Sequence, residues 1–369
     1  MKNLSITLNA AVLCCAFLAG SIAFAQTVIT IDNNPGSTTT HQTIQAAHDA
    51  ASSGDIIYVQ PSGTNYGSVD IEKPLTIVGR SHSEPGKVSS LQTITINSSN
   101  ITIKGISFSS LNNNGASSAP APPPFIGLEV FECEFSSLTL GTTPSQTAST
   151  VIDDVVFRGN VFSSFTVFAD TNDVLVSNNI IRSSGTFYNS SSMVVANNIF
   201  NTSSTSITLQ NVSSGVVLMY NNMFINNESS DLNINFFSGP FNLSNNLTYN
   251  YGSGNAVFAT VSGGTFQEND TLLDTDPQFT NVDSTISQSF AGSSTYNPAF
   301  RLEDNLTLQA GSPALTGGGG GSQIGLYNNG FNYNVLGNPR DIPLLDIESN
   351  DAAVPAGSTI NVTVTAKAN

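Results

Sequence analysis

The chain has 369 residues, with 10 Lys or Arg against 26 Asp or Glu, and its formal net charge at neutral pH is −16. A surface this acidic argues against nucleic acids and anionic membranes as partners, because like charges repel. It also argues against an anionic polysaccharide, unless calcium bridges the two.

The first 25 residues have the composition of a secretory signal peptide. Lys2 supplies a small positive region, residues 8–20 are apolar, and Ala23-Phe-Ala25 is a small-residue cleavage site. The apolar run is too short for a membrane span. We expect cleavage after Ala25 and export, to the medium, the periplasm or the cell surface. The mature chain then keeps one cysteine, Cys133, so no intrachain disulfide is expected.

The segment 41–54 is predicted to form a short helix, in which Ile44, Ala47 and Ala51 share one apolar face and Gly54 is the expected residue just past the helix end. A strand is expected at 55–59. A solenoid needs a cap so that its first coil does not expose a sheet edge, and this helix is the expected cap.

A short apolar phrase recurs seven times between residues 101 and 248. Apolar residues alternate within each phrase, which predicts strands. Steps of 27, 27, 19, 19, 24 and 24 residues between repeats are typical of a solenoid. We therefore predict an all-β right-handed parallel β-helix with an N-terminal capping helix and a short C-terminal β tail. The sixth residue of each repeat is its anchor: Ile106, Cys133, Asn160, Asn179, Asn198, Asn222 and Asn246.

Asn occupies five of the seven anchors. Asn tolerates the left-handed backbone that a sharp bend requires, and stacked Asn side chains can bond from coil to coil. We therefore expect the anchors to form the turns and a hydrogen-bonded ladder. An eighth, irregular coil is expected at 75–80, with Arg80 at its anchor. Two residues after the anchors, Phe162, Phe200 and Phe224 are expected to form an internal stack.

Several segments carry a resemblance to a known group. Residues 43–59 and 72–79 look like the opening of the pectate-lyase-like superfamily, and they are most similar to secreted bacterial right-handed parallel β-helix repeat proteins. Residues 276–279, 300–303 and 310–314 resemble the closing coils of that group, and 323–327 matches its final phrase loosely. The resemblance covers about residues 26–330. It implies the fold, while one fold hosts many activities.

Two sets of residues are candidates for the chemistry of parallel β-helix enzymes that cut acidic polysaccharides. A lyase needs a Lys or Arg base and a cation beside the uronate; Lys104 and Arg158 share one outward column two coils apart, roughly 10 Å at the usual strand spacing. A hydrolase uses clustered carboxylates. Asp154 and Asp173 both lie six residues before their anchors. The second set, which is also the candidate calcium site, is Asp153, Asp154, Asp170 and Asp173. The alternative is that these Asp residues serve turns.

No complete catalytic set emerges from the sequence. We therefore predict an exported, non-catalytic surface protein that is structural or binds glycans. The alternative is a polysaccharide lyase or hydrolase that uses Lys104 and Arg158 or the four Asp residues. A polysaccharide or cell-surface glycan is the expected partner in both cases, and the oligomeric state stays open.

The sequence divides into a signal peptide (1–25), a β-helix (26–330) and a β tail (331–369).

Four outward positions in adjacent coils are aliphatic where polar residues are expected. An exposed patch of this kind is rare on a soluble monomer, so we expect residues 340–366 to pack across it; the alternative cover is a partner chain. The four aliphatic residues are Val156, Leu175, Val194 and Leu218.

Overall fold

The computed structural model describes residues 26–340 and 342–367, apart from 114–124, 142–150, 168–170, 184, 189–191, 202–205, 211–215, 226–232, 238–239, 250–259, 263–264, 283–303 and 351–361. The predicted signal peptide and Asp170 lie outside these described residues. None of the described helices is long and apolar enough to cross a bilayer.

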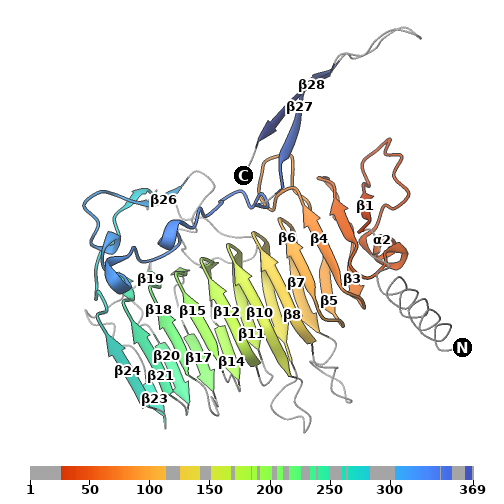
Figure 1. Ribbon diagram of the computed structural model, residues 1–369. Helices are drawn as coiled ribbons and strands as arrows, with labels where there is room; N and C mark the ends of the chain where they lie inside the picture. Colours follow the sequence, from red (N-terminus) through yellow and green to blue (C-terminus); the bar gives the residue numbers. More distant parts are fainter. Residues whose placement is uncertain are drawn as a thin grey trace, which may run out of the picture.

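Two parallel sheets, each built from one strand or strand pair per coil, make up the body of the molecule (Figure 1). The predicted right-handed parallel β-helix is confirmed by this topology. Sheet A contains β1 (Val28–Ile31), β2 (Ile56–Val59), β4 (Leu75–Gly79), β6 (Ile101–Lys104), β8 (Phe125–Phe131), β10 (Ile152–Arg158), β12 (Thr171–Ser177), β15 (Met193–Ala196), β18 (Val217–Tyr220), β21 (Pro240–Ser244) and β24 (Thr265–Asn269).

Sheet B faces sheet A across the core. In the first coils each strand is continuous, and in the later coils it is split into two short strands. Its members are β3 (Val69–Ile71), β5 (Thr93–Ile96), β7 (Ser107–Asn113), β9 (Glu134–Leu140), β11 (Val161–Val167), β13 (Ile180–Ile181), β14 (Gly185–Tyr188), β16 (Ile199–Asn201), β17 (Ser206–Gln210), β19 (Met223–Ile225), β20 (Asn233–Phe237), β22 (Leu247–Tyr249) and β23 (Thr260–Ser262).

The register of sheet A is the one that the repeats predict. Each coil places its first apolar residue beside its neighbour's, and β4 joins the series because Leu75 pairs with Ile101. The coil with Arg80 at its anchor is therefore confirmed. The paired residues from β6 onward are Ile101, Leu128, Val155, Val174, Met193, Val217 and Phe241.

The anchor asparagines form a buried ladder between the two sheets. The Asn179 side-chain amide donates to Asn198 Oδ1 at 2.9 Å, and that of Asn198 donates to Asn222 Oδ1 at 3.0 Å. The ladder is confirmed, but the left-handed residue is not the anchor. It is the residue before it, as at Asn178 (φ 56°) and Asn197 (φ 60°). The bend thus uses one residue for backbone conformation and the next for buried hydrogen bonds.

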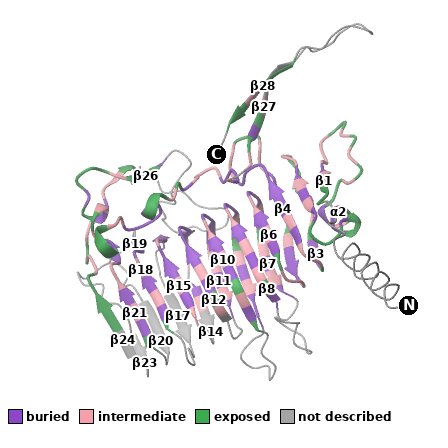
Figure 2. Cartoon of the chain, in the orientation of Figure 1, coloured by how far each residue is buried: buried purple, intermediate pink, exposed green. Residues whose placement is uncertain are grey.

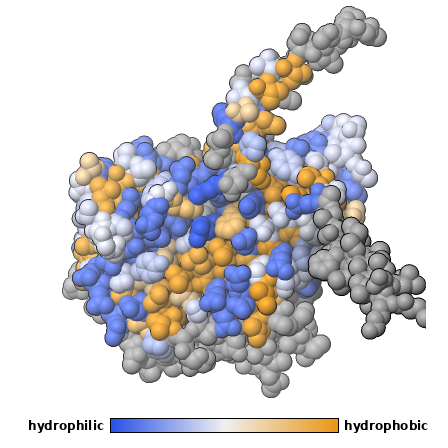
Figure 3. Space-filling view, viewed as in Figure 1, coloured by the Kyte–Doolittle hydropathy of each residue, from blue (hydrophilic) through white to orange (hydrophobic). Residues whose placement is uncertain are grey.

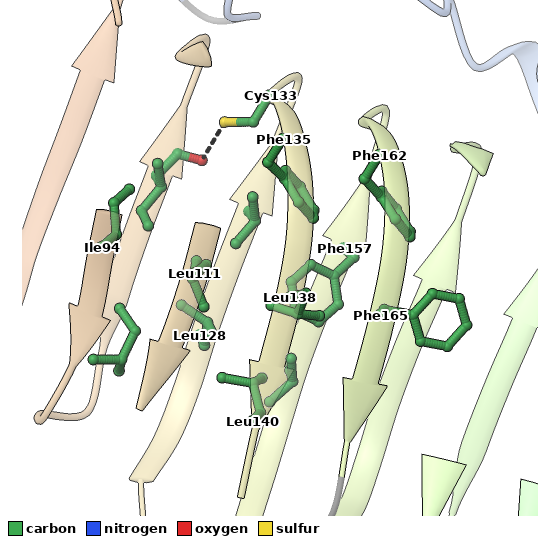
Figure 4. Packing of buried hydrophobic residues seen from close by; sticks show 14 of the residues in the cluster. Ile94, Leu111, Leu128, Cys133, Phe135, Leu138, Leu140, Phe157, Phe162 and Phe165 are labelled. Atoms are coloured by element: carbon green, nitrogen blue, oxygen red, sulfur yellow. Dashed lines mark hydrogen bonds between the residues drawn. The ribbon is translucent and has the colours of Figure 1, made fainter. Parts of the chain in front are cut away.

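The buried positions of the strands line the inside of the β-helix (Figure 2), where aromatic rings stack from coil to coil (Figure 4). Phe135 and Phe162 lie parallel with centroids 4.9 Å apart, and Phe200 and Phe224 do so at 4.8 Å. The predicted single stack is wrong in one respect. Ile181 pairs with Phe162 on one side and Phe200 on the other, so it separates two stacks.

Helix α2 (Ile44–Ala50) covers the first coil, with Ile44 and Ala47 fully buried. Thr43 is its N-cap and accepts from the Ala46 amide. The helix ends at Ala50, earlier than predicted. Gly54, with φ of 90°, lies in the turn to β2 instead of just past the helix end.

A strap, residues 317–340, runs back along the turn edge of the β-helix, over the ends of the sheet A strands (Figure 1). It follows the antiparallel pair β25 (Phe279–Asn281) and β26 (Asn305–Leu308) and contains short 3₁₀ turns at Gly319–Gly321 and Asn328–Gly330. Asn178 Nδ2 donates to the Leu326 carbonyl at 2.8 Å. The strap buries an outward apolar column that the sequence repeats did not predict. In it, Val161, Ile180, Ile199, Met223 and Leu247 pack with Ile324, Leu326 and Tyr333.

Residues 331–340 of the predicted tail continue the strap, and the rest forms a hairpin of β27 (Leu344–Asn350) and β28 (Val362–Lys367). The hairpin extends away from the β-helix (Figure 1). Asp346 attaches it to the Arg80 turn, at 3.0 Å from Arg80 and 2.6 Å from Lys87. Leu345, Val362 and Val364 are at least 50% exposed. The expected packing of 340–366 across the aliphatic residues of sheet A is therefore not seen among the described residues.

Candidate functional site

A pocket of about 210 Å³ lies on the outer side of sheet A, where the strap crosses the strand ends. We call it the basic pocket. Its lining residues are Lys104, Phe131, Glu132, Arg158, Phe331 and Arg340. Three of the chain's 10 basic residues therefore meet at one place, in a protein whose net charge is −16.

Three adjacent strands supply one wall of the pocket. Lys104, Phe131 and Arg158 are the last residues of β6, β8 and β10, and the register places them side by side. Their alternation with buried neighbours directs all three side chains outward. The Lys104 ammonium lies 5.4 Å from the centre of the Phe131 ring, and Arg158 Nε donates to Ser177 Oγ at 3.1 Å.

The strap supplies the opposite wall. The Arg340 guanidinium stacks on Phe331, 3.7 Å from the ring centre, and Arg340 Nε lies 2.5 Å from Glu132 Oε1. The Arg340 backbone amide donates to the other Glu132 oxygen at 2.9 Å. Arg340 is thus held and neutralised by Glu132, and this pair fixes the strap to the turn after β8.

Glu132 occupies a constrained position. Its φ of 54° is left-handed, and its side chain is 4% exposed. Burial raises the pKa of the Glu132 carboxyl above its ordinary value, against the opposing effect of the bonds from Arg340. The left-handed backbone belongs to the turn, because the residue before the anchor has it in the other coils too, as at Asn178 and Asn197.

The positive charge that faces the pocket comes from Lys104 and Arg158. Among the described residues, neither forms an ion pair, in contrast to Arg340. A guanidinium and an ammonium that share a pocket are suited to a carboxylate or another oxyanion, because the charge-assisted hydrogen bonds they make are stronger than neutral ones. The arrangement is suited to an anion, with two aromatic rings beside it.

The sequence predicted part of this pocket. It placed Lys104 and Arg158 in one outward column, and the structure brings them together around Phe131. It missed Arg340 and Phe331, which come from a segment without periodicity. It also missed Glu132, for which a signal existed: the corresponding positions in neighbouring coils are Gly105 and Gly159, so an acidic residue there is unusual.

The three described Asp residues of the predicted carboxylate cluster, Asp153, Asp154 and Asp173, lie at bends of the strands. Asp154 and Asp173 are exposed and left-handed, with φ of 52° and 48°. They share this conformation with Asn100 and Gly127, which occupy the same position in preceding coils. Asp153 accepts from the Asp154 amide at 2.9 Å, as in a local turn. Among the described residues no group of three potential metal ligands is found, and Asp170 lies outside them.

We expect calcium to leave the melting temperature unchanged, because the described Asp side chains serve a bend in the strand. Melting curves in millimolar Ca²⁺ and in EDTA should therefore superimpose. An increase in melting temperature with calcium that disappears in Asp154→Asn would contradict this and restore the calcium site.

A second titratable cluster lies deeper under the strap. His82 is 3% exposed, its Nδ1 lies 3.8 Å from Glu134, and Arg182 lies 3.0 Å from the same carboxylate. Burial lowers the pKa of His82 to about 4, which leaves the ring neutral at physiological pH. Gly337 packs directly on the imidazole. The enclosure of this cluster favours a structural role, in which it holds the strap.

No protein-family model matches the chain, and no curated protein matches it. Among solved structures, the pectin methylesterase from Aspergillus niger, in a penultimately deglycosylated form, is 15% identical. The alignment covers 69% of this chain and 87% of that chain, with a TM-score of 0.32. A likeness this distant carries no argument about function, which must come from the site.

Proposed function

We propose that this exported β-helix protein binds an acidic glycan without modifying it, and that the basic pocket receives a carboxylate of that glycan. The observation that carries the proposal is the meeting of Lys104 and Arg158, without acidic partners among the described residues, beside two aromatic rings. Sugar rings pack well on such rings, while the cations supply orientation.

The size and surroundings of the pocket narrow the ligand class. Its volume of about 210 Å³ lies below the ~300 Å³ at which pockets for drug-sized ligands begin. It therefore suits one terminal or branching acidic sugar better than a long segment. The acidic surface elsewhere repels a dense polyanion, which favours a glycan with isolated carboxylates over a polyuronate.

A lyase activity remains the second candidate, since Lys104 and Arg158 are the residue types that abstract a proton and neutralise a uronate. A hydrolase is less well supported. It needs two carboxyl groups flanking the bond, and the one carboxyl group that lines the pocket, Glu132, is engaged by Arg340 through two contacts.

Calorimetry with matched saccharides tests the proposal. An oligosaccharide that ends in a uronate should bind, and its neutral analogue should bind at least tenfold more weakly. Arg158→Gln and Lys104→Gln should each reduce the affinity for the acidic sugar by tenfold or more, since each removes one charge-assisted contact. The matched control is Lys367→Gln, which removes a cation from the hairpin and should have no effect.

Equal affinity for the acidic and neutral sugars would overturn the proposal. The same samples are followed by ultraviolet absorbance for an unsaturated uronate and by a reducing-end assay. Product formation that is lost in Lys104→Gln would replace the binding function with that of a lyase.

A further inference from the structure

We propose further that the ligand is an anionic amphiphile, whose acidic sugar enters the basic pocket while an extended acyl or alkyl chain lies on sheet A. This inference rests on the proposed carboxylate site. The surface for the chain is the aliphatic row, which we define as Val156, Leu175, Val194 and Leu218. The ligand class is therefore an acidic glycolipid.

The row is continuous along the axis of the β-helix. Val156 pairs with Leu175, Leu175 with Val194, and Val194 with Leu218, so four side chains stand side by side. At about 4.8 Å per strand, the three steps span roughly 14 Å. An extended chain advances about 1.2 Å per bond, so the row matches about twelve bonds of a linear aliphatic chain.

The row begins at the pocket. Val156 and Arg158 lie two residues apart on the outer face of β10, a separation of roughly 7 Å along the strand. Arg158 also reaches toward Ser177 of the next coil, the direction in which the row runs. A carboxylate bound at Arg158 therefore has the aliphatic row within the length of one sugar unit.

The row is accessible to a ligand. Its four residues are all partly exposed, and three hairpin residues that were expected to help cover them, Leu345, Val362 and Val364, are themselves at least half exposed. Figure 3 shows hydrophobic side chains gathered in the middle of this face of the molecule. The solvent-facing side of a sheet is ordinarily polar, and a contiguous apolar strip marks a binding surface.

Polar residues bound the row at both ends and along part of one flank. Glu129, which accepts from Thr102 at 3.0 Å, ends it next to Val156, and Asn242 ends it beyond Leu218. Exposed Asp154 and Asp173 lie along one flank. Val216, which is 46% exposed, lies two residues before Leu218 and widens the apolar strip at that end. The remainder of the strip is narrow, which suits a linear chain. It is too narrow for a second copy of this protein, because a stable interface buries about 800 Å² per partner.

The test compares three probes, each used below its micelle-forming concentration: dodecyl β-D-glucuronide, methyl β-D-glucuronide and dodecyl maltoside. Calorimetry should show dodecyl glucuronide binding at least tenfold more tightly than the methyl compound, and dodecyl maltoside at least tenfold more weakly than dodecyl glucuronide. Leu175→Ser should abolish the gain from the dodecyl chain and leave methyl glucuronide binding unchanged. The matched control is Leu273→Ser, an exposed leucine outside the row, which should alter nothing.

The outcomes separate the two proposals. Equal affinity for methyl and dodecyl glucuronide would overturn the amphiphile and leave the carboxylate site standing. Failure of both glucuronides to bind would overturn the carboxylate site and the inference with it. Binding of dodecyl maltoside as tight as that of dodecyl glucuronide would show an apolar surface without anion recognition, which also overturns the inference. Where Leu175→Ser melts at a lower temperature than the parent, Leu218→Ser repeats the comparison.

Discussion

Replacing Asn198 by leucine should lower the free energy of unfolding by about 3–6 kcal/mol. Asn198 is fully buried in the ladder, where its Oδ1 accepts from the Asn179 backbone amide at 3.0 Å and its Nδ2 donates to the Val176 carbonyl at 2.8 Å. Leucine fills a similar volume but leaves both backbone groups without their partner. Each buried polar group left unsatisfied costs about 1–3 kcal/mol, and the bond to Asn222 is lost as well.

Equilibrium unfolding in denaturant measures the effect. Asn198→Asp is an informative second variant: it keeps the acceptor for Asn179 but places a carboxylate against the Val176 and Asn222 oxygens, so it should also destabilise. Asn332→Leu, on the exposed part of the strap, is the control and should change stability by less than about 0.5 kcal/mol. A loss below about 1 kcal/mol in Asn198→Leu would show that the ladder contributes little.

Replacing Phe200 by alanine should cost about 3–5 kcal/mol, as truncations of buried phenylalanine do. The ring is fully buried and stacks on Phe224 with centroids 4.8 Å apart and planes 10° from parallel. Its other axial neighbour is Ile181. A cavity between coils cannot collapse easily, because the hydrogen bonds of both sheets fix the coil spacing.

The same unfolding measurement applies, with Phe131→Ala as the matched control. Phe131 is on the outer face and partly exposed, so its truncation should cost much less. The loss of stability in Phe200→Leu should lie between the losses in Phe200→Ala and Phe131→Ala. If Phe200→Ala and Phe131→Ala destabilise the protein equally, the inward assignment of the column that contains Phe200 is wrong.

The turn shows where reasoning from the sequence reached its limit. Four coils carry consecutive asparagines at the bend, such as Asn178 and Asn179. Either residue of such a pair can adopt a left-handed backbone, so the sequence leaves open which of them does. The choice depends on which side chain enters the ladder between the two sheets, and that is decided by packing against the neighbouring coils. Gly105 and Gly159 held the missing signal, because glycine before the anchor marks the position with positive φ.

The predicted packing of the tail is not seen among the described residues, for a related reason. The aliphatic row was found correctly from its periodicity, but the choice of its cover assumed that the nearest apolar segment would dock there. The structure instead pairs β27 with β28 and attaches the hairpin through Asp346 to Arg80 and Lys87. The strap meanwhile covers a different column, which includes Ile180 and Ile199.

The amino-acid sequence by itself determined the coils, their register and the outward column that holds Lys104 and Arg158. These follow from alternation along a strand and from the stacking of like residues, which are local and repeated. Only the tertiary structure decided that Arg340 meets Glu132, 208 residues away, and closes the pocket. The strap has no period, and its path depends on the shape and charge of the surface that the completed coils present.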